Sequence, residues 1–118
     1  MSETHDILES LCTVEGVTGA FLIDEDANII DFVAPEDFEV DNLAGLSHKC
    51  IESGIKIAGI IDKKEVKQTF IEYADSNLTL DLLSNGVILA LLASSGANLG
   101  RIRLELRKTK KKVEKELG

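Results

Sequence analysis

The side chains that could perform chemistry are few, and their spacing suits no common active site. The chain has two histidines, His5 and His48, and two cysteines, Cys12 and Cys50. On one helix, His48 and Cys50 would point about 200° apart, so they could not readily bind the same metal ion. Two cysteines without a CxxC spacing are more typical of buried, reduced thiols than of a disulfide or a metal site. We therefore expect no metal ion and no disulfide.

Three short strings resemble parts of known sites, and each lacks an essential component. Residues 94–96 read Ser-Ser-Gly, without the GxSxG context of a serine hydrolase or a basic partner nearby. Asp24-Glu25-Asp26 starts like a calcium loop, but the full loop pattern and its closing Glu are missing. Residues 95–100 could hold a phosphate at a helix start, although a capped loop is the simpler explanation. Since there is also no P-loop GxxxxGK[ST], the sequence predicts a protein that is not an enzyme and has no cofactor.

Length and charge narrow the classes of partner. The 118 residues suffice for one domain with a hydrophobic core, which we expect to span 1–118. The formal net charge of −8 argues against nucleic acid as the main partner, because phosphate binding needs a basic surface. No apolar run approaches the roughly 20 residues of a membrane span, and the polar, acidic N-terminus does not resemble a signal peptide. The sequence thus predicts a cytoplasmic protein with no transmembrane segment.

The basic residues are concentrated near the end of the chain, between Arg101 and Lys115. Such a run of basic residues usually forms the solvent-exposed face of a helix. The alternative is a weak contact of this basic helix with a membrane surface or an acidic partner.

The stretch Val66–Ala93 organises the predicted fold as three consecutive strands. Turn signals separate them, above all Asn85-Gly86, which favours a type I′ turn with φ > 0 at both residues. The middle strand alternates leucines with Thr79 and Asp81, which predicts one covered face. The third strand is apolar on both faces, as is typical of the centre of a sheet. The first strand, Val66–Tyr73, is therefore expected at the sheet edge.

The elements around this stretch complete the predicted fold. They are a helix at 4–13, strands at 17–24 and 29–33, a long helix at 43–61 capped by Asp41 or Asn42, and a basic helix at about 98–117 that starts at Asn98 and frays after Lys110. The order α-β-β-α-β-β-β-α indicates an α+β sandwich with a five-stranded antiparallel sheet. We expect the long helix on one face and the terminal helices on the other, as in profilin-like and longin-like folds.

The long helix has apolar and small residues over about half of its circumference, whereas a helix lying on one surface needs only about 100°. Its two flanks, with Gly54 between them, are Leu43, Leu46, Cys50, Ile57 and Ile61 on one side and Ala44, Ser47, Ile51, Ile55 and Ala58 on the other. Either this helix is deeply buried in its own domain, or it also covers a surface of another chain. The edge strand raises the same question, because Phe70 on one face and Ile71 and Tyr73 on the other would leave an unpaired apolar edge.

Four strings, taken in order and spacing, resemble the Roadblock (dynein light chain 7) family and especially its prokaryotic branch. They are Val14–Asp24, Val66–Tyr73, Leu89–Ala93 and Asn98–Arg103. The first hairpin turn differs: the family often has Asp-Gly where this chain has Asp26-Ala27-Asn28. Asn28 can adopt the left-handed conformation, so this difference does not change the expected fold.

The resemblance implies a small non-catalytic dimer, paired through the central helix and the edge strand, that binds and regulates or scaffolds a Ras-like small GTPase. Dynein-type or membrane-complex scaffold subunits and small-molecule sensor domains are the alternatives, and a heterodimer with a related chain stays open. Together with the apolar arc, the resemblance predicts a dimer interface of Ala44, Ser47, Ile51, Gly54, Ile55, Ala58, Phe70, Ile71 and Tyr73. The predicted partner-binding margin is Asn42, His48, Lys49, Glu52 and Lys56.

Overall fold

The helices and strands follow the predicted order in the computed structural model, which describes residues 3–35, 37–62 and 65–117. The elements are α1 (Glu3–Leu11), β1 (Val17–Ile23), β2 (Ile29–Val33), α2 (Val40–Ile60), β3 (Gln68–Glu72), β4 (Ser76–Leu82), β5 (Ile88–Ser94) and α3 (Leu99–Leu117). The predicted α+β class is confirmed.

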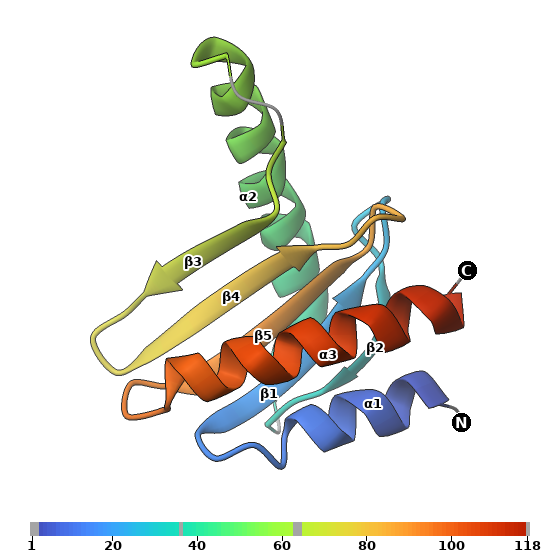
Figure 1. Cartoon of the computed structure of the whole chain (residues 1–118), viewed down its shortest axis with the longest axis vertical. Helices are drawn as coiled ribbons and strands as arrows, with labels where there is room; N and C mark the ends of the chain where they lie inside the picture. The colour runs from blue at the N-terminus through green and yellow to red at the C-terminus, as the bar shows by residue number, and fades with distance from the viewer. Residues whose placement is uncertain (1–2, 36, 63–64, 118) are drawn as a thin grey trace.

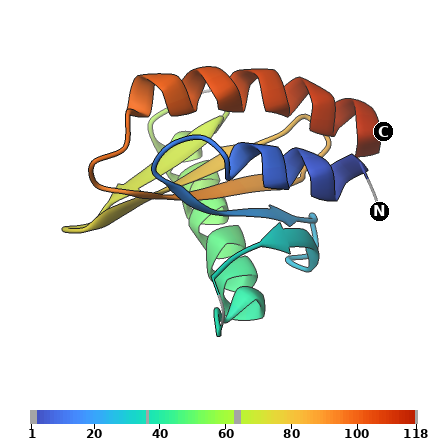
Figure 2. The same ribbon diagram turned by 90° about the horizontal axis from the view of Figure 1, so that it is seen from below.

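The five strands form one antiparallel sheet in the order β2-β1-β5-β4-β3. β1 and β5 are inner strands, as the two apolar faces of β5 predicted for that strand, and β3 lies at one edge. Figures 1 and 2 show α2 on one face of the sheet and α1 with α3 on the other, as expected. Each face has its own core: Leu22 and Leu89 point toward α1 and α3, and Phe21 and Ile88 point toward α2.

The prediction of one covered face for β4 is wrong, because α3 buries its polar face as well. Thr79 and Asp81 are both buried. The carboxylate of Asp81 lies 3.8 Å from the ammonium of Lys110 on α3. Burial is the main cause that raises the pKa of Asp81, and Lys110 opposes the shift. A polar strand face can therefore lie under a helix when that helix supplies a counter-charge.

The last helix, α3, continues to Leu117 and does not fray after Lys110 as predicted. Val113 is fully buried, and the Glu114 carboxylate accepts a 2.7 Å hydrogen bond from the backbone N–H of Ser84. This bond lowers the pKa of Glu114. At the other end, Asn98 caps the helix as predicted, since its Oδ1 accepts from the N–H of Arg101.

Two boundaries differ from the prediction. α2 begins at Val40, before the expected caps Asp41 and Asn42, because the apolar Val40 packs against the core and extends the helix. Its N-cap, Glu39, makes no side-chain capping hydrogen bond. β3 is shorter than Val66–Tyr73, since sheet pairing covers only Gln68–Glu72.

The β1–β2 and β4–β5 hairpins share one turn geometry. In each turn, the fourth residue donates its backbone N–H to the carbonyl oxygen of the first, and the first donates its own N–H to the carbonyl oxygen of the fifth. The fourth residue has a left-handed backbone conformation. That residue is Gly86 in the second hairpin (φ 82°) and Ala27 in the first (φ 67°). Asn85 and Asn28 have negative φ, so neither the type I′ turn nor a left-handed Asn28 is present; both turns are type I turns with a bulge.

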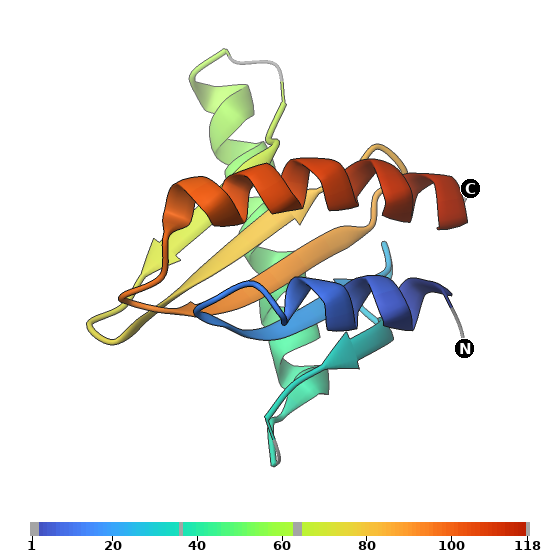
Figure 3. The ribbon, with the colours of Figure 1, turned by 60° about the horizontal axis from the view of Figure 1, so that its bottom comes forward.

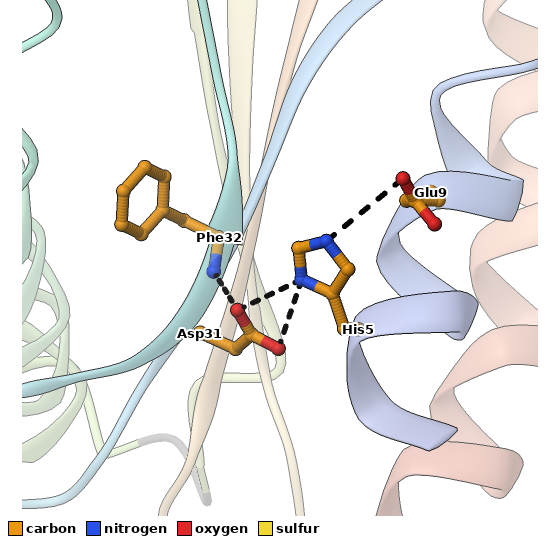
Figure 4. A network of polar contacts seen from close by, with 4 residues as sticks. All are labelled: His5, Glu9, Asp31 and Phe32. Atoms are coloured by element: carbon orange, nitrogen blue, oxygen red, sulfur yellow. Dashed lines mark hydrogen bonds and ion pairs between the residues drawn. The ribbon is translucent and has the colours of Figure 1, made fainter. Parts of the chain in front are cut away.

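A polar contact fastens α1 to the edge strand β2. His5 Nδ1 lies 3.0 Å from one carboxylate oxygen of Asp31 and 3.2 Å from the other, and the same carboxylate accepts from the N–H of Phe32 (Figure 4). The hydrogen bond with Asp31 is the main cause that raises the pKa of His5. Glu9, 3.9 Å from Nε2, adds a smaller effect of the same sign.

Replacing Ala27 by glycine should stabilise the protein by about 1 kcal/mol, because glycine takes φ > 0 without the steric cost that alanine carries. Denaturant unfolding measures the gain. Asn28→Gly is the control: φ at Asn28 is negative, so this variant should be no more stable than the wild type. A stabilised Asn28→Gly would contradict the turn geometry.

The His5 ring should titrate above its ordinary pKa of 6.5. Protonation of His5 strengthens its hydrogen bond to Asp31, so the protonated ring stabilises the folded protein. This stabilisation is fully present below pH 6.5, the pKa in the unfolded chain, and is lost as the pH rises through the higher pKa of His5 in the folded protein. An NMR titration of the ring checks this. Asp31→Asn should return the pKa of His5 toward 6.5, and Glu9→Gln should change it less.

Candidate protein interaction surface

α2 is too long for the sheet that it covers. It has 21 residues, and its buried ones are Ala44, Ser47, Ile51 and Ala58. Figures 1 and 3 show its C-terminal turns extending beyond the strands, past the β3 side of the sheet. This end of the helix therefore has large apolar side chains without a sheet beneath them.

The exposed flank of α2 consists of Leu46, Ile57 and Ile60. These side chains are 66%, 55% and 83% exposed. At 100° per residue they lie within about 60° of one another, on the same side of the helix. Ile61, directly after the helix, is also exposed. Isolated exposed leucines are ordinary, but an aligned set of large apolar side chains is a candidate contact surface.

The structure reverses the two flanks predicted from the sequence. Ala44, Ser47 and Ile51 were expected at a dimer contact, but they are buried against the protomer's own sheet, and Ala58 lies on the same side. Gly54 faces Val66, whose side chain lies 3.2 Å from the position that a Cβ would occupy. Of the predicted helix positions, Ile55 remains half exposed, on the side opposite the exposed flank. The flank that faces outward is the one that contains Leu46 and Ile57.

The edge strand β3 adjoins the exposed flank. Among the described residues, β3 pairs with β4 on one side and with no strand on the other. Ile71 and Tyr73 face α2, and Tyr73 is about half exposed; Phe70 lies on the α3 face and is partly exposed. The predicted division of these three side chains between the two faces is therefore correct.

An apolar cavity of about 160 Å³ joins the helix flank to the strand edge. The buried hydroxyl of Ser47 lines it and has no hydrogen-bond partner, the one such side-chain atom within the described ranges. An unsatisfied buried hydroxyl costs about 1–3 kcal/mol. The cavity is lined by Leu43, Leu46, Ser47, Cys50, Ile71, Tyr73, Leu78 and Leu80. The packing between α2 and the edge of the sheet is thus incomplete in the single chain.

The outward crest of α2 is polar. Asn42, Lys49, Glu52 and Lys56 are all exposed there. His48, predicted with them, has a different place: its Nε2 lies 2.9 Å from the carbonyl oxygen of Glu25 in the β1–β2 turn. His48 therefore fastens α2 to that turn, a long-range contact that no local pattern in the sequence could reveal.

The strings first considered for chemistry have structural roles. Asp24 Oδ1 accepts the N–H groups of Asp26 and Asn28, and these bonds lower the pKa of Asp24. Cys12 and Cys50 are free thiols that pack half-buried against the two cores, and burial raises the pKa of Cys12. In the part of the chain that the structure describes, no cluster of His, Cys, Asp or Glu could hold a metal ion, and no helix has the length and hydropathy to cross a membrane.

Solved structures share this architecture. Myxococcus xanthus MglB superposes with a TM-score of 0.93 over 99% of this chain and 96% of its own, at 19% identity. A Roadblock/LC7 domain from Streptomyces avermitilis gives 0.88 over 98% of each chain, at 24% identity. LokiProfilin1, solved in complex with rabbit actin, gives 0.66 over 96% of each chain, at 18% identity, which agrees with the predicted profilin-like fold. At these identities the likeness concerns the fold.

A comparison with curated proteins gives no significant match. The family model of the Roadblock/LC7 domain matches residues 3–93, from α1 through nearly all of β5. This range contains the sheet, α2 and the free β3 edge, and it ends before α3. The chain therefore belongs to the Roadblock/LC7 domain family.

Proposed function

We propose that the chain is a non-catalytic homodimeric module that binds and regulates a Ras-like small GTPase. The observation that carries the proposal is the exposed flank of α2 beside the free edge of β3. Leu46, Ile57 and Ile60 would be covered by the same partner that pairs with β3. The family supports the proposal, because the Roadblock resemblance implies dimers of this kind and an association with small GTPases.

In the proposed dimer, the two β3 strands pair antiparallel about a two-fold axis perpendicular to the sheet. This pairing satisfies the open edge and joins two five-stranded sheets into one. It also brings the two α2 helices together on one face, where apolar side chains of each protomer reach the other's cavity beside Ser47. The contact is isologous, so each copy fills the space that the other leaves.

The GTPase would bind on the crest of the paired α2 helices. Asn42, Lys49, Glu52 and Lys56 supply polar contacts of both charges there. A single GTPase seated on the two-fold axis makes different contacts with the two protomers. We no longer include His48 among the partner-binding residues, because its ring is hydrogen-bonded to the backbone carbonyl of Glu25.

The position of the arginines favours ordering of the GTPase over a supplied catalytic arginine. Arg101, Arg103 and Arg107 belong to α3, which lies on the opposite face of the sheet from α2 (Figure 2). A partner on the α2 crest is therefore out of their reach. Regulation would act by selecting one state of the GTPase's switch segments.

The apolar cavity beside α2 gives little support to the sensor alternative. Pockets for small molecules usually have about 300–1,000 Å³, and the apolar cavity beside α2 has about 160 Å³. Its place at the proposed dimer contact also suits a partner side chain better than a free ligand.

Ile57→Glu should dissociate the dimer, because the contact would bury an unpaired charge at a cost of about 3–5 kcal/mol. Ile57 is half exposed in the single chain, so the protomer should stay folded. Ile30→Glu, at an exposed position on the opposite edge strand β2, is the control and should stay dimeric. Light scattering gives the mass, and circular dichroism checks the fold. A wild type that is monomeric at micromolar concentration would contradict the proposal.

The dimer should bind one nucleotide state of its GTPase more tightly, since a ligand indifferent to two states shifts neither. Calorimetry with Ras-like GTPases of the same organism, loaded with GDP or a non-hydrolysable GTP analogue, measures the difference. Lys49→Glu on the crest should weaken binding several-fold, whereas Arg101→Gln on α3 should not. Equal affinities for the two nucleotide states would indicate a passive scaffold and contradict a regulatory role. Loss of stimulated hydrolysis with retained binding in Arg101, Arg103 or Arg107 variants would instead indicate a catalytic arginine.

A further inference from the structure

α3 differs in charge from the rest of the chain. Of the 13 Lys and Arg residues, eight lie in α3, but only three of the 21 Asp and Glu residues do. The remainder of the chain therefore has five cations and 18 carboxylates. An ordinary soluble surface mixes the two signs, so this separation calls for a reason. α3 also lies outside the residues that match the family model, so that match does not explain its charge.

Between Arg101 and Lys115, every exposed side chain of α3 except one is cationic. Around the helix they spread over about 180°, centred opposite the buried Ile102, Leu106 and Val113. The exception is Leu104, which is 48% exposed and lies at the middle of this arc. We call this set the outer face of α3: Arg101, Arg103, Leu104, Arg107, Lys108, Lys111, Lys112 and Lys115.

The carboxylates of α3 are directed away from the outer face. Glu114 is engaged with the backbone of Ser84. Glu105 is half-buried at the margin, where it lies 3.8 Å from Lys108. Glu116 lies beside Glu3 of α1, and this neighbour raises its pKa. Lys110, the cation that pairs with Asp81, is likewise outside the set. The outer face thus has seven cations and little internal neutralisation.

We propose that the outer face of α3 binds the surface of an anionic lipid bilayer. Its cations spread over about half of the helix circumference, and Figure 2 shows α3 as the outermost layer of its side of the molecule, above α1. An outermost helix can meet a flat surface along its whole length. Leu104, in the middle of the cations, can enter the headgroup layer. Helix α1, which contains Glu3, Asp6 and Glu9, lies lower, toward the sheet, and its negative charge opposes closer approach.

This attachment would leave α2 facing away from the membrane. α2 and α3 lie on opposite faces of the sheet, so the apolar flank and polar crest of α2 stay accessible while α3 is bound. Because the contact belongs to a single chain, it does not depend on the dimer or the GTPase. A dimer with both α3 helices on one face would double the number of cations and bind more tightly.

Vesicle flotation tests the proposal with the full chain. The wild type should float with phosphatidylcholine vesicles that contain phosphatidylserine and not with phosphatidylcholine alone, and high salt should release it. Lys108→Gln/Lys111→Gln should weaken partitioning by roughly 25-fold per protomer, at about fivefold per lysine. The matched control, Lys49→Gln/Lys56→Gln, removes the same charge from α2 and should float like the wild type.

Three results would overturn the proposal: no flotation with phosphatidylserine vesicles, equal flotation with phosphatidylcholine alone, or an equal loss in both double variants. A second copy of the acidic chain is the competing occupant. It would produce salt-sensitive association in lipid-free solution that Lys108→Gln/Lys111→Gln removes, without vesicle binding. The Ile57→Glu variant separates this test from that of the dimer, since it should still float, although less strongly.

Discussion

The fold depends on covering two faces of a five-stranded sheet with three helices. At about 4.8 Å between neighbouring strands, the outer strands lie about 19 Å apart, whereas a helix with its side chains is about 10–12 Å wide. α1 and α3 together can cover one face, and they do so with a continuous core. α2 alone cannot cover the other. The apolar residues at the β3 edge and the outer flank of α2 therefore remain without a cover from the same chain.

The properties of the candidate surface follow from this mismatch. The cavity beside Ser47 lies where the single helix leaves the sheet uncovered, and the C-terminal turns of α2 extend where no strand supports them. On the opposite face two helices cover most of the sheet, and the outer side of α3 is mainly cationic, with Leu104 as its one exposed apolar side chain between Arg101 and Lys115. The two faces thus suit different partners: an apolar surface of a second protein on the α2 side, and a charged surface on the α3 side.

Helical periodicity identified both flanks of α2 but could not say which of them meets the sheet. Small residues such as Ala44, Ser47 and Ala58 allow close approach of any neighbour, whether another helix or the protomer's own strands. In the structure they allow α2 to lie close to the sheet. Leu46 and Ile57 of the other flank remain exposed. A similar ambiguity explains why the burial of Asp81 was not predicted. The alternation of polar and apolar residues in β4 suggested that Asp81 faces solvent, but Lys110, 29 residues later in the chain, supplies a counter-charge that allows its burial.

The sequence by itself determined the order of the elements, the inner and edge strands, the Asn98 cap and the absence of familiar catalytic motifs, because each depends on a short local pattern. Tertiary structure decided what depends on residues far apart in the chain. It set which flank of α2 is exposed, the length of α3 beyond Lys110, and the contacts of His5 with Asp31 and of His48 with Glu25. It also placed Ala27, not Asn28, in the left-handed position, because the register of β1 with β2 determines which turn residue bulges. Local patterns record what a residue prefers, whereas burial and pairing depend on what the rest of the chain brings opposite to it.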